Sequence, residues 1–288
     1  MKLDGRREST NVEDRRGTSG GKVAGLGIGG IAIVAIITLL MGGNLGDVFQ
    51  NVVQSGGLQD QTVSQYEPTA ENEALAKFSR QILASTEDVW TKYFAENGIG
   101  TYRAPTLVLY TGTTSSACGQ GQAALGPFYC SADEKVYLDL SFFSSMKKQL
   151  GADGDFAYAY VIAHEVGHHV QHLLGTLEQA HQQMARMSKT DANKMSVRIE
   201  LQADFYAGLW GHYENALFGS LEQGDLEEAI RCASVIGDDY LQKKSQGYAV
   251  EDSFTHGTAA QRMKWLKKGF TTGDIRQGNT FNVSDSQL

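Results

Sequence analysis

The chain has 288 residues, of which 41% are hydrophobic and 20% charged, and a formal net charge of −8 at pH 7. This balance is typical of a folded protein, so it excludes a largely disordered chain. The acidic charge argues against nucleic acid as a partner, because phosphate binding needs clustered lysine and arginine. The three cysteines are too few for a disulfide-rich scaffold or an all-cysteine zinc site.

The chain begins with two segments of opposite character. Residues 1–22 contain six basic and four acidic side chains and few apolar ones, which predicts a disordered polar tail. Residues 23–43 contain no charged side chain over 21 positions, a length that crosses a bilayer as a helix. A buried core helix and a cleaved signal peptide are the alternatives. The run is long for either, and no clear cleavage site follows it, so we predict an uncleaved transmembrane signal anchor.

The charges on either side of this apolar run predict an orientation. Six basic residues precede it, and the first one after it is Lys77. The positive-inside rule then places residues 1–22 in the cytoplasm as a tail and the remainder outside. Residues 44–70 are rich in Gln, Asn, Ser and Gly and are interpreted as a flexible linker, so the folded domain is expected over residues 71–288.

The domain is predicted to be α+β and dominated by helices. Apolar residues at helical spacing predict an amphipathic helix over residues 71–97. Residues 105–110 and 135–142 are expected to form strands of a small sheet, because they are short apolar or alternating runs. Further helices are expected at 155–174, 177–187, 191–218, 224–246 and 259–269.

The helix expected over residues 155–174 carries the sequence His164-Glu165-Val166-Gly167-His168. Two histidines at i and i+4 lie on one helix face, so both can reach one metal ion. Glu165 lies beside them, where it would act as general base on a water molecule that the metal activates. The alternative is a solvated helix face of His and Glu.

A catalytic zinc ion needs a third protein ligand. The pattern HExxHxxGxxH is excluded, because Gln171 and Leu174 stand where it needs glycine and histidine. Glu200 and Asp204 lie 32 and 36 residues after His168 and share a face of the next long helix. We expect Glu200 on the metal and Asp204 behind it, accepting the spare N–H of a ligand histidine. Solvated carboxylates are the alternative, but this helix is largely apolar.

A second histidine-containing segment precedes the last helix. His256 is followed six residues later by Arg262. Both side chains would be able to donate to the oxyanion that forms when water attacks a carbonyl. On spacing alone, a surface histidine and a solvated arginine remain open.

Four segments resemble one family. HEVGHHVQ, RIELQADFYAG, SFTHGTAAQR and GPFYCSAD, running on to KVYLDLSFF, are similar to the neutral zinc metallopeptidase family of bacterial single-span membrane proteins. The resemblance covers most of residues 100–270 and the apolar N-terminal run. The pattern is also similar to the wider gluzincin group. In the related motif of that group proline follows the downstream histidine, whereas Gly257 stands there in this chain.

The resemblance implies a zincin-like metalloprotease domain with one Zn²⁺ per chain. It implies His164, His168 and Glu200 as zinc ligands, Glu165 as the catalytic base, and transition-state contacts from His256 and Arg262. Combined with the predicted orientation, it implies a single-pass protein of the bacterial inner membrane, with the lipid bilayer contacted by residues 23–43 and the catalytic domain in the periplasm.

The cysteines fit a location outside the cytoplasm. Cys118 and Cys130 flank a Gly-rich loop, and a disulfide between them is expected there, with two free thiols as the alternative. Cys232 lies among apolar residues and is expected to be buried.

We therefore expect a membrane-anchored zinc metalloendopeptidase that acts on proteins or peptides. Two other functions stay open. One is a zinc-containing chaperone or interaction module that does not cut, and the other is a zinc hydrolase of a non-peptide bond such as a cell-wall amide.

Overall fold

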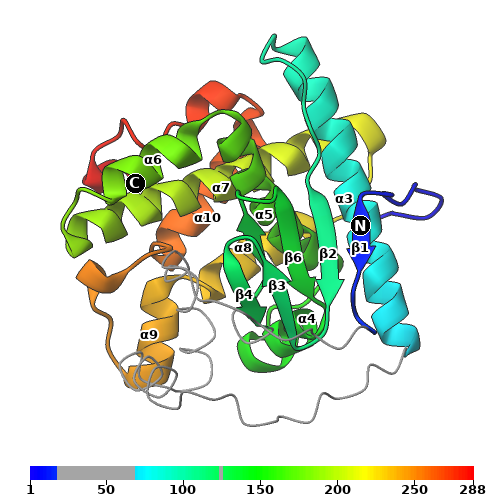
Figure 1. Ribbon diagram of the computed structural model, residues 1–288, viewed down its shortest axis with the longest axis horizontal. Helices are drawn as coiled ribbons and strands as arrows, with labels where there is room; N and C mark the ends of the chain where they lie inside the picture. Colours follow the sequence, from blue (N-terminus) through cyan, green and yellow to red (C-terminus); the bar gives the residue numbers. More distant parts are fainter. Residues whose placement is uncertain (18–68, 123–125) are drawn as a thin grey trace.

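The computed structural model describes residues 1–17, 69–122 and 126–288 of the chain (Figure 1). Helices make up most of these residues, and they are accompanied by a four-stranded sheet and a two-stranded hairpin. The chain is thus a helix-dominated α+β protein with small sheets, as predicted.

The four-stranded sheet has the order β1-β2-β6-β5. Its strands are β1 (Val12–Asp14), β2 (Thr106–Tyr110), β6 (Lys135–Asp139) and β5 (Phe128–Cys130). The first three are parallel, and β5 runs antiparallel to β6. The hairpin consists of β3 (Thr113–Ser116) and β4 (Gly119–Gln122).

Both faces of the sheet are covered. Because strand residues alternate between faces, the sheet divides its apolar side chains between two clusters. One face joins the main core of the protein, through Leu107, Leu109, Tyr129, Val136 and Leu138. The other face forms a separate small cluster of Val108, Tyr110, Phe128, Cys130 and Tyr137. The β3–β4 hairpin lies on this second face, since a Cβ added to Gly121 would come within 2.6 Å of the Phe128 ring.

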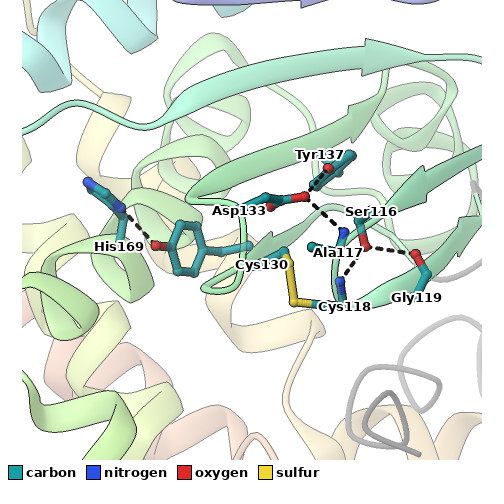
Figure 2. The surroundings of a disulfide bond; sticks show 9 residues. Ser116, Ala117, Cys118, Gly119, Cys130, Asp133, Tyr137 and His169 are labelled. Carbon is teal, nitrogen blue, oxygen red and sulfur yellow. Dashed lines mark hydrogen bonds between the residues drawn. A yellow bond between two sulfur atoms is a disulfide. The ribbon is translucent and has the colours of Figure 1, made fainter. Parts of the chain in front are cut away.

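A disulfide ties the hairpin to the sheet. Cys118, at the turn between β3 and β4, is bonded to Cys130 on β5 (Figure 2). Asp133 adds a second tie, because its carboxylate accepts hydrogen bonds from the Ala117 N–H at 2.9 Å and the Tyr137 hydroxyl at 2.7 Å. Cys232 is free and fully buried, as predicted.

Most helices lie close to their predicted positions. The helices of the structure are α3 (Ala70–Glu96), α4 (Ser141–Ser145), α5 (Asp155–Leu173), α6 (Thr176–Met184), α7 (Lys189–Phe218), α8 (Asp225–Val235), α9 (Asp238–Gln246) and α10 (Ala259–Thr272). Helix α4 was not predicted, and it begins within the strand expected over residues 135–142. A π-helical turn, η2 (Met146–Leu150), continues α4, and η3 (Glu251–Ser253), η4 (Ile275–Gly278) and η5 (Asp285–Gln287) are short 3₁₀ turns.

The helix predicted over residues 224–246 is instead two helices, α8 and α9. The break falls at Gly237, where an added Cβ would lie 2.2 Å from the backbone nitrogen of Ala259. The start of α10 therefore needs a residue without a side chain at this point. The helical periodicity of the sequence continues across Gly237 and does not reveal this long-range contact. One continuous helix was therefore predicted.

Close helix packing at glycines forms the centre of the molecule. Helix α5 approaches α7 at Gly167, where a Cβ would lie 2.9 Å from the Ala203 carbonyl oxygen. On its other side α7 meets α10 at Gly208 and Gly269, where a Cβ would lie 2.1 and 2.0 Å from backbone oxygens of the partner helix. Helix α7 is thus held between two helices at short backbone distances.

The prediction of a disordered N-terminal tail is wrong for residues 1–17. Strand β1 pairs with β2, and Figure 1 shows this blue segment beside α3. Met1, Leu3 and Val12 are partly buried against the main core, but most of the contacts that hold the segment are polar, which explains why composition suggested disorder. Arg6 forms an ion pair at 2.7 Å with Glu214, which is completely buried on α7. Ser9 and Asn11 donate to the buried carboxylate of Glu87 on α3, at 2.6 and 2.7 Å.

The predicted transmembrane helix and membrane location are corrected. No helix in the described residues is long and apolar enough to cross a bilayer, and residues 23–43 themselves lie outside the described ranges, as does most of the predicted linker 44–70. The predicted orientation also conflicts with the sheet. Strand β1 and strand β2 are hydrogen-bonded neighbours, so residues 1–17 and the domain cannot lie on opposite sides of a membrane.

The Arg6–Glu214 pair gives a test of this arrangement. We expect Arg6→Ala to lower the free energy of unfolding in urea by about 3 kcal/mol, because it leaves a buried carboxylate without its cation. Glu8→Ala is the matched control, since it removes an exposed ion pair with Arg80 from the same segment and should cost less than about 1 kcal/mol. Equal stability of the two variants would contradict the docking of this segment.

Candidate metal centre

Two helices bring the predicted ligand residues together. On α5, His164 and His168 lie one turn apart, and on α7, Glu200 and Asp204 do the same. The close approach of these helices at Gly167 lies within this group, and it allows Glu200 to reach both histidines. His164 Nε2 lies 3.1 Å and His168 Nε2 lies 3.5 Å from the carboxylate oxygens of Glu200.

The geometry fits a metal ion. Ligand atoms of His164, His168 and Glu200 all lie within 4.8 Å of one another, and this is the one such group of His, Cys, Asp and Glu in the described ranges. Two imidazole nitrogens and one carboxylate form a typical ligand set of a catalytic zinc site, which leaves a fourth position for water or substrate.

The outer nitrogens of both histidines are held by other side chains. His164 Nδ1 lies 2.8 Å from an Asp204 oxygen, and His168 Nδ1 lies 2.9 Å from the Gln171 side-chain oxygen. Gln171 is itself fixed, because its amide donates to the carbonyl of Ile199 at 2.8 Å. If each Nδ1 donates its hydrogen outwards, Nε2 of both histidines is left to bind a metal ion at the shared point, which is the tautomer that metal binding needs.

The buried carboxylates demand positive charge at this point. Burial alone would raise the pKa of Glu200, yet the charges of His168 and His256 and a hydrogen bond from His164 hold it well below its ordinary value. Burial would likewise lower the pKa of His164, but Asp204 and then Glu200 raise it to about 10. Without a metal ion, a proton on His164 thus balances part of the negative charge of these carboxylates.

Glu165 lies next to the first ligand on α5 and is largely buried. Burial raises the pKa of its carboxyl group, and the neighbouring histidines His164 and His168 oppose this effect. A carboxylate whose pKa is raised toward the working pH is suited to accept and return a proton.

Arg262 occupies a different place from the one predicted. It is buried on α10, and its guanidinium binds Asp204 with two hydrogen bonds of 2.8 and 2.9 Å. It also donates to the Tyr160 hydroxyl at 3.2 Å, and that hydroxyl donates to Asp204 at 2.5 Å. Although burial raises it, Arg262 and His164 bring the pKa of Asp204 to about 2. Arg262 therefore acts on Asp204, and its role as an oxyanion donor is not supported by its contacts.

His256 is brought to the metal site by the loop before α10. Its backbone N–H and those of Thr255 and Gly257 all donate to one oxygen of the buried Asp238, at 2.7, 2.8 and 3.0 Å. The other Asp238 oxygen lies 3.4 Å from His256 Nδ1. Burial would lower the pKa of His256, but the charges of Glu200 and Asp238 raise it. These two carboxylates therefore favour protonation of the His256 imidazole relative to a free histidine.

Three supporting residues were missed by the sequence analysis. Tyr160 precedes His164 by one helical turn, so its position on the same face was available as a signal. Gln171, considered only for its mismatch to another motif, follows His168 by three residues on the same helix. Asp238 had no such signal, because it follows the unpredicted break at Gly237.

Comparison with known proteins agrees with this site. A family model described as "Putative neutral zinc metallopeptidase" matches residues 1–281. The chain belongs to this family. The match includes the N-terminal segment that packs against the domain, as well as the residues of the candidate metal centre.

Bacterial relatives extend this comparison. The protein YpfJ of Escherichia coli (strain K12), named uncharacterized, is 51% identical over 99% of this chain and 100% of its own length. The protein Rv2575 of Mycobacterium tuberculosis (strain ATCC 25618 / H37Rv), also named uncharacterized, is 39% identical over 64% of each chain. No solved structure matches the chain.

The contacts of Arg262 predict a role in stability. We expect Arg262→Ala to lower the free energy of unfolding of the metal-free protein by about 3–5 kcal/mol, because Asp204 would keep its buried charge without this partner. Urea unfolding measures the effect, and Lys267→Ala, an exposed change on the same helix, serves as control. A variant with unchanged stability would instead favour the predicted contact with substrate.

Proposed function

We propose that the protein is a zinc-dependent endopeptidase. The observation that carries this proposal is the convergence of His164, His168 and Glu200 ligand atoms within 4.8 Å, with Glu165 beside them. The family supports a peptidase and hence protein or peptide substrates. The cleavage of internal peptide bonds and the roles of single residues are our own inference.

In this proposal one Zn²⁺ per chain is held by His164, His168 and Glu200. When bound, the ion supplies a Lewis acid that polarises the substrate carbonyl and lowers the pKa of water toward about 7. Asp204 positions His164 from behind, and Arg262 and Tyr160 hold Asp204. This chain of buried contacts keeps the ligand in place before substrate binds.

Glu165 would act as the general base. It would take a proton from the attacking water and pass it to the leaving amine, which its largely buried position and raised pKa support. His256 would donate to the oxyanion that develops on the carbonyl. The Asp238 carboxylate supports this role, since it holds the backbone of the loop and faces His256 Nδ1, leaving Nε2 for the substrate.

The substrate would bind as an added strand. Strand β5 is the last strand on its side of the sheet, and among the described residues no further strand pairs with its outer edge. Alternate residues of an edge strand present free N–H and C=O groups, which an extended peptide can pair with. The side chain of Tyr129 on this strand reaches His169 on α5, the residue that follows the proposed ligand His168 in the chain.

The role of Glu165 can be tested by Glu165→Gln. The amide cannot accept the proton, so we expect peptide hydrolysis to fall by a factor of at least about 100 while zinc content stays at one ion per chain. A quenched-fluorescent peptide library and metal analysis measure the two properties, and a chelator provides the control for the wild type. Equal hydrolysis by wild type and variant would refute the mechanism. Zinc binding by a wild type that hydrolyses no peptide would favour a chaperone or a hydrolase of another amide.

The ligand set gives a separate prediction. Glu200→Gln should weaken zinc binding by a factor of at least about 100, because it removes a charged ligand. Asp204→Asn should weaken zinc binding by about 10–100-fold, because it removes only the negative charge that supports the ligand His164. Competition with a zinc indicator measures both affinities. Glu178→Gln, which alters a carboxylate that faces His172, is the control with unchanged affinity. Unchanged zinc affinity in Glu200→Gln would remove Glu200 from the site.

A further inference from the structure

Strand β5 is too short to be held by the sheet alone. It has three residues, and within the part of the chain that the structure describes it pairs with β6 only. Edge strands of this length contribute few ladder hydrogen bonds, so their position depends on contacts from their side chains. In β5 two adjacent residues provide such contacts on opposite faces of the sheet.

On the face toward the helices, Tyr129 is linked to α5. Its hydroxyl lies 2.9 Å from Nδ1 of His169, the residue that follows the metal ligand His168. The imidazole of His169 is fully buried, and its Nε2 lies 2.6 Å from the carbonyl oxygen of Arg103. A carbonyl oxygen can only accept, so Nε2 carries the hydrogen and Nδ1 accepts from the tyrosine hydroxyl.

On the opposite face, Cys130 is bonded to Cys118 of the hairpin, as Figure 2 shows together with His169. Asp133, in the turn between β5 and β6, binds the same hairpin by accepting a hydrogen bond from the N–H of Ala117. The hairpin therefore holds β5 from one side and His169 holds it from the other. The connection through His169 is the one that leads to the metal centre.

We propose that His169 is a positioning residue for peptide binding, which acts through Tyr129 to fix the edge strand β5 relative to the metal ligands on α5. This inference rests on the proposed function and adds the residue that positions β5, the strand with which the substrate would pair. His169 contacts neither metal nor substrate. Its two hydrogen bonds join α5, β5 and the segment before β2 at one point.

The test is Tyr129→Phe, which removes the hydroxyl and leaves the ring. The control is Tyr102→Phe, because the Tyr102 ring also lies against His169, at a centroid distance of 5.9 Å, but its buried hydroxyl has no hydrogen-bond partner in the described ranges. Both proteins are prepared as full chains loaded with zinc. The probes are a quenched-fluorescent decapeptide that the wild type cleaves and a tetrapeptide around the same bond.

For Tyr129→Phe we expect KM for the decapeptide to rise about three- to tenfold, the value of one hydrogen bond, with kcat within about twofold. KM for the tetrapeptide should change less, since a short substrate pairs with less of β5. Zinc affinity and Tyr102→Phe should match the wild type. The double variant Tyr129→Phe/His169→Leu should be no worse than His169→Leu alone, because both changes remove the same bond. Unchanged KM in Tyr129→Phe, or an equal effect on both peptides, would overturn the proposal.

A readout that needs no peptidase activity separates this inference from the proposed function. Hydrogen exchange of the β5 amides should be faster in zinc-loaded Tyr129→Phe than in the wild type and in Tyr102→Phe. If the wild type cleaves no peptide but β5 exchanges faster, the proposed function fails and the positioning of β5 by His169 stands. If exchange of β5 is unchanged, the positioning role fails whatever the activity.

Discussion

The hydrogen bonds to the buried carboxylate of Asp204 are the interactions on which the candidate metal centre depends. This carboxylate is completely inaccessible to solvent and accepts hydrogen bonds from Tyr160, His164 and Arg262, which come from α5 and α10. A buried charge without partners costs several kcal/mol, so these helices must meet α7 in one arrangement only. That arrangement also fixes the tautomer of His164 and leaves its Nε2 free to face Glu200.

The same principle explains the N-terminal segment. Two further carboxylates, Glu87 and Glu214, are buried on the long helices, and both take hydrogen-bond donors from residues 1–17. The segment therefore completes the charge balance of the domain and also adds strand β1 to its sheet. Although residues 1–17 contribute little apolar surface, they are ordered because they bind buried carboxylates of the domain. This packing places residues 1–17 and the domain on the same side of any membrane.

In the proposed function, Glu165 and His256 act on the substrate, while other residues around the candidate metal centre hold their neighbours in place. Burial raises the pKa of Glu165, and the carboxylates of Glu200 and Asp238 raise the pKa of His256. Arg262, Gln171 and Asp238 are each engaged with a neighbouring residue of the site. A residue of the right type at the expected spacing, as Arg262 is, can thus serve stability and orientation instead of the chemistry.

The sequence alone determined the main helices, the strands β2 and β6, and the ligand candidates His164, His168 and Glu200, because these depend on local periodicity and on i, i+4 spacing along a helix. It did not reveal the break at Gly237 or the ordered N-terminal strand. Each of these depends on a contact between residues far apart in the chain. Only the tertiary structure decided that Arg262 pairs with Asp204. The cost of burying a charge is balanced by whichever partner the packing brings within hydrogen-bonding distance, and sequence spacing does not show that partner.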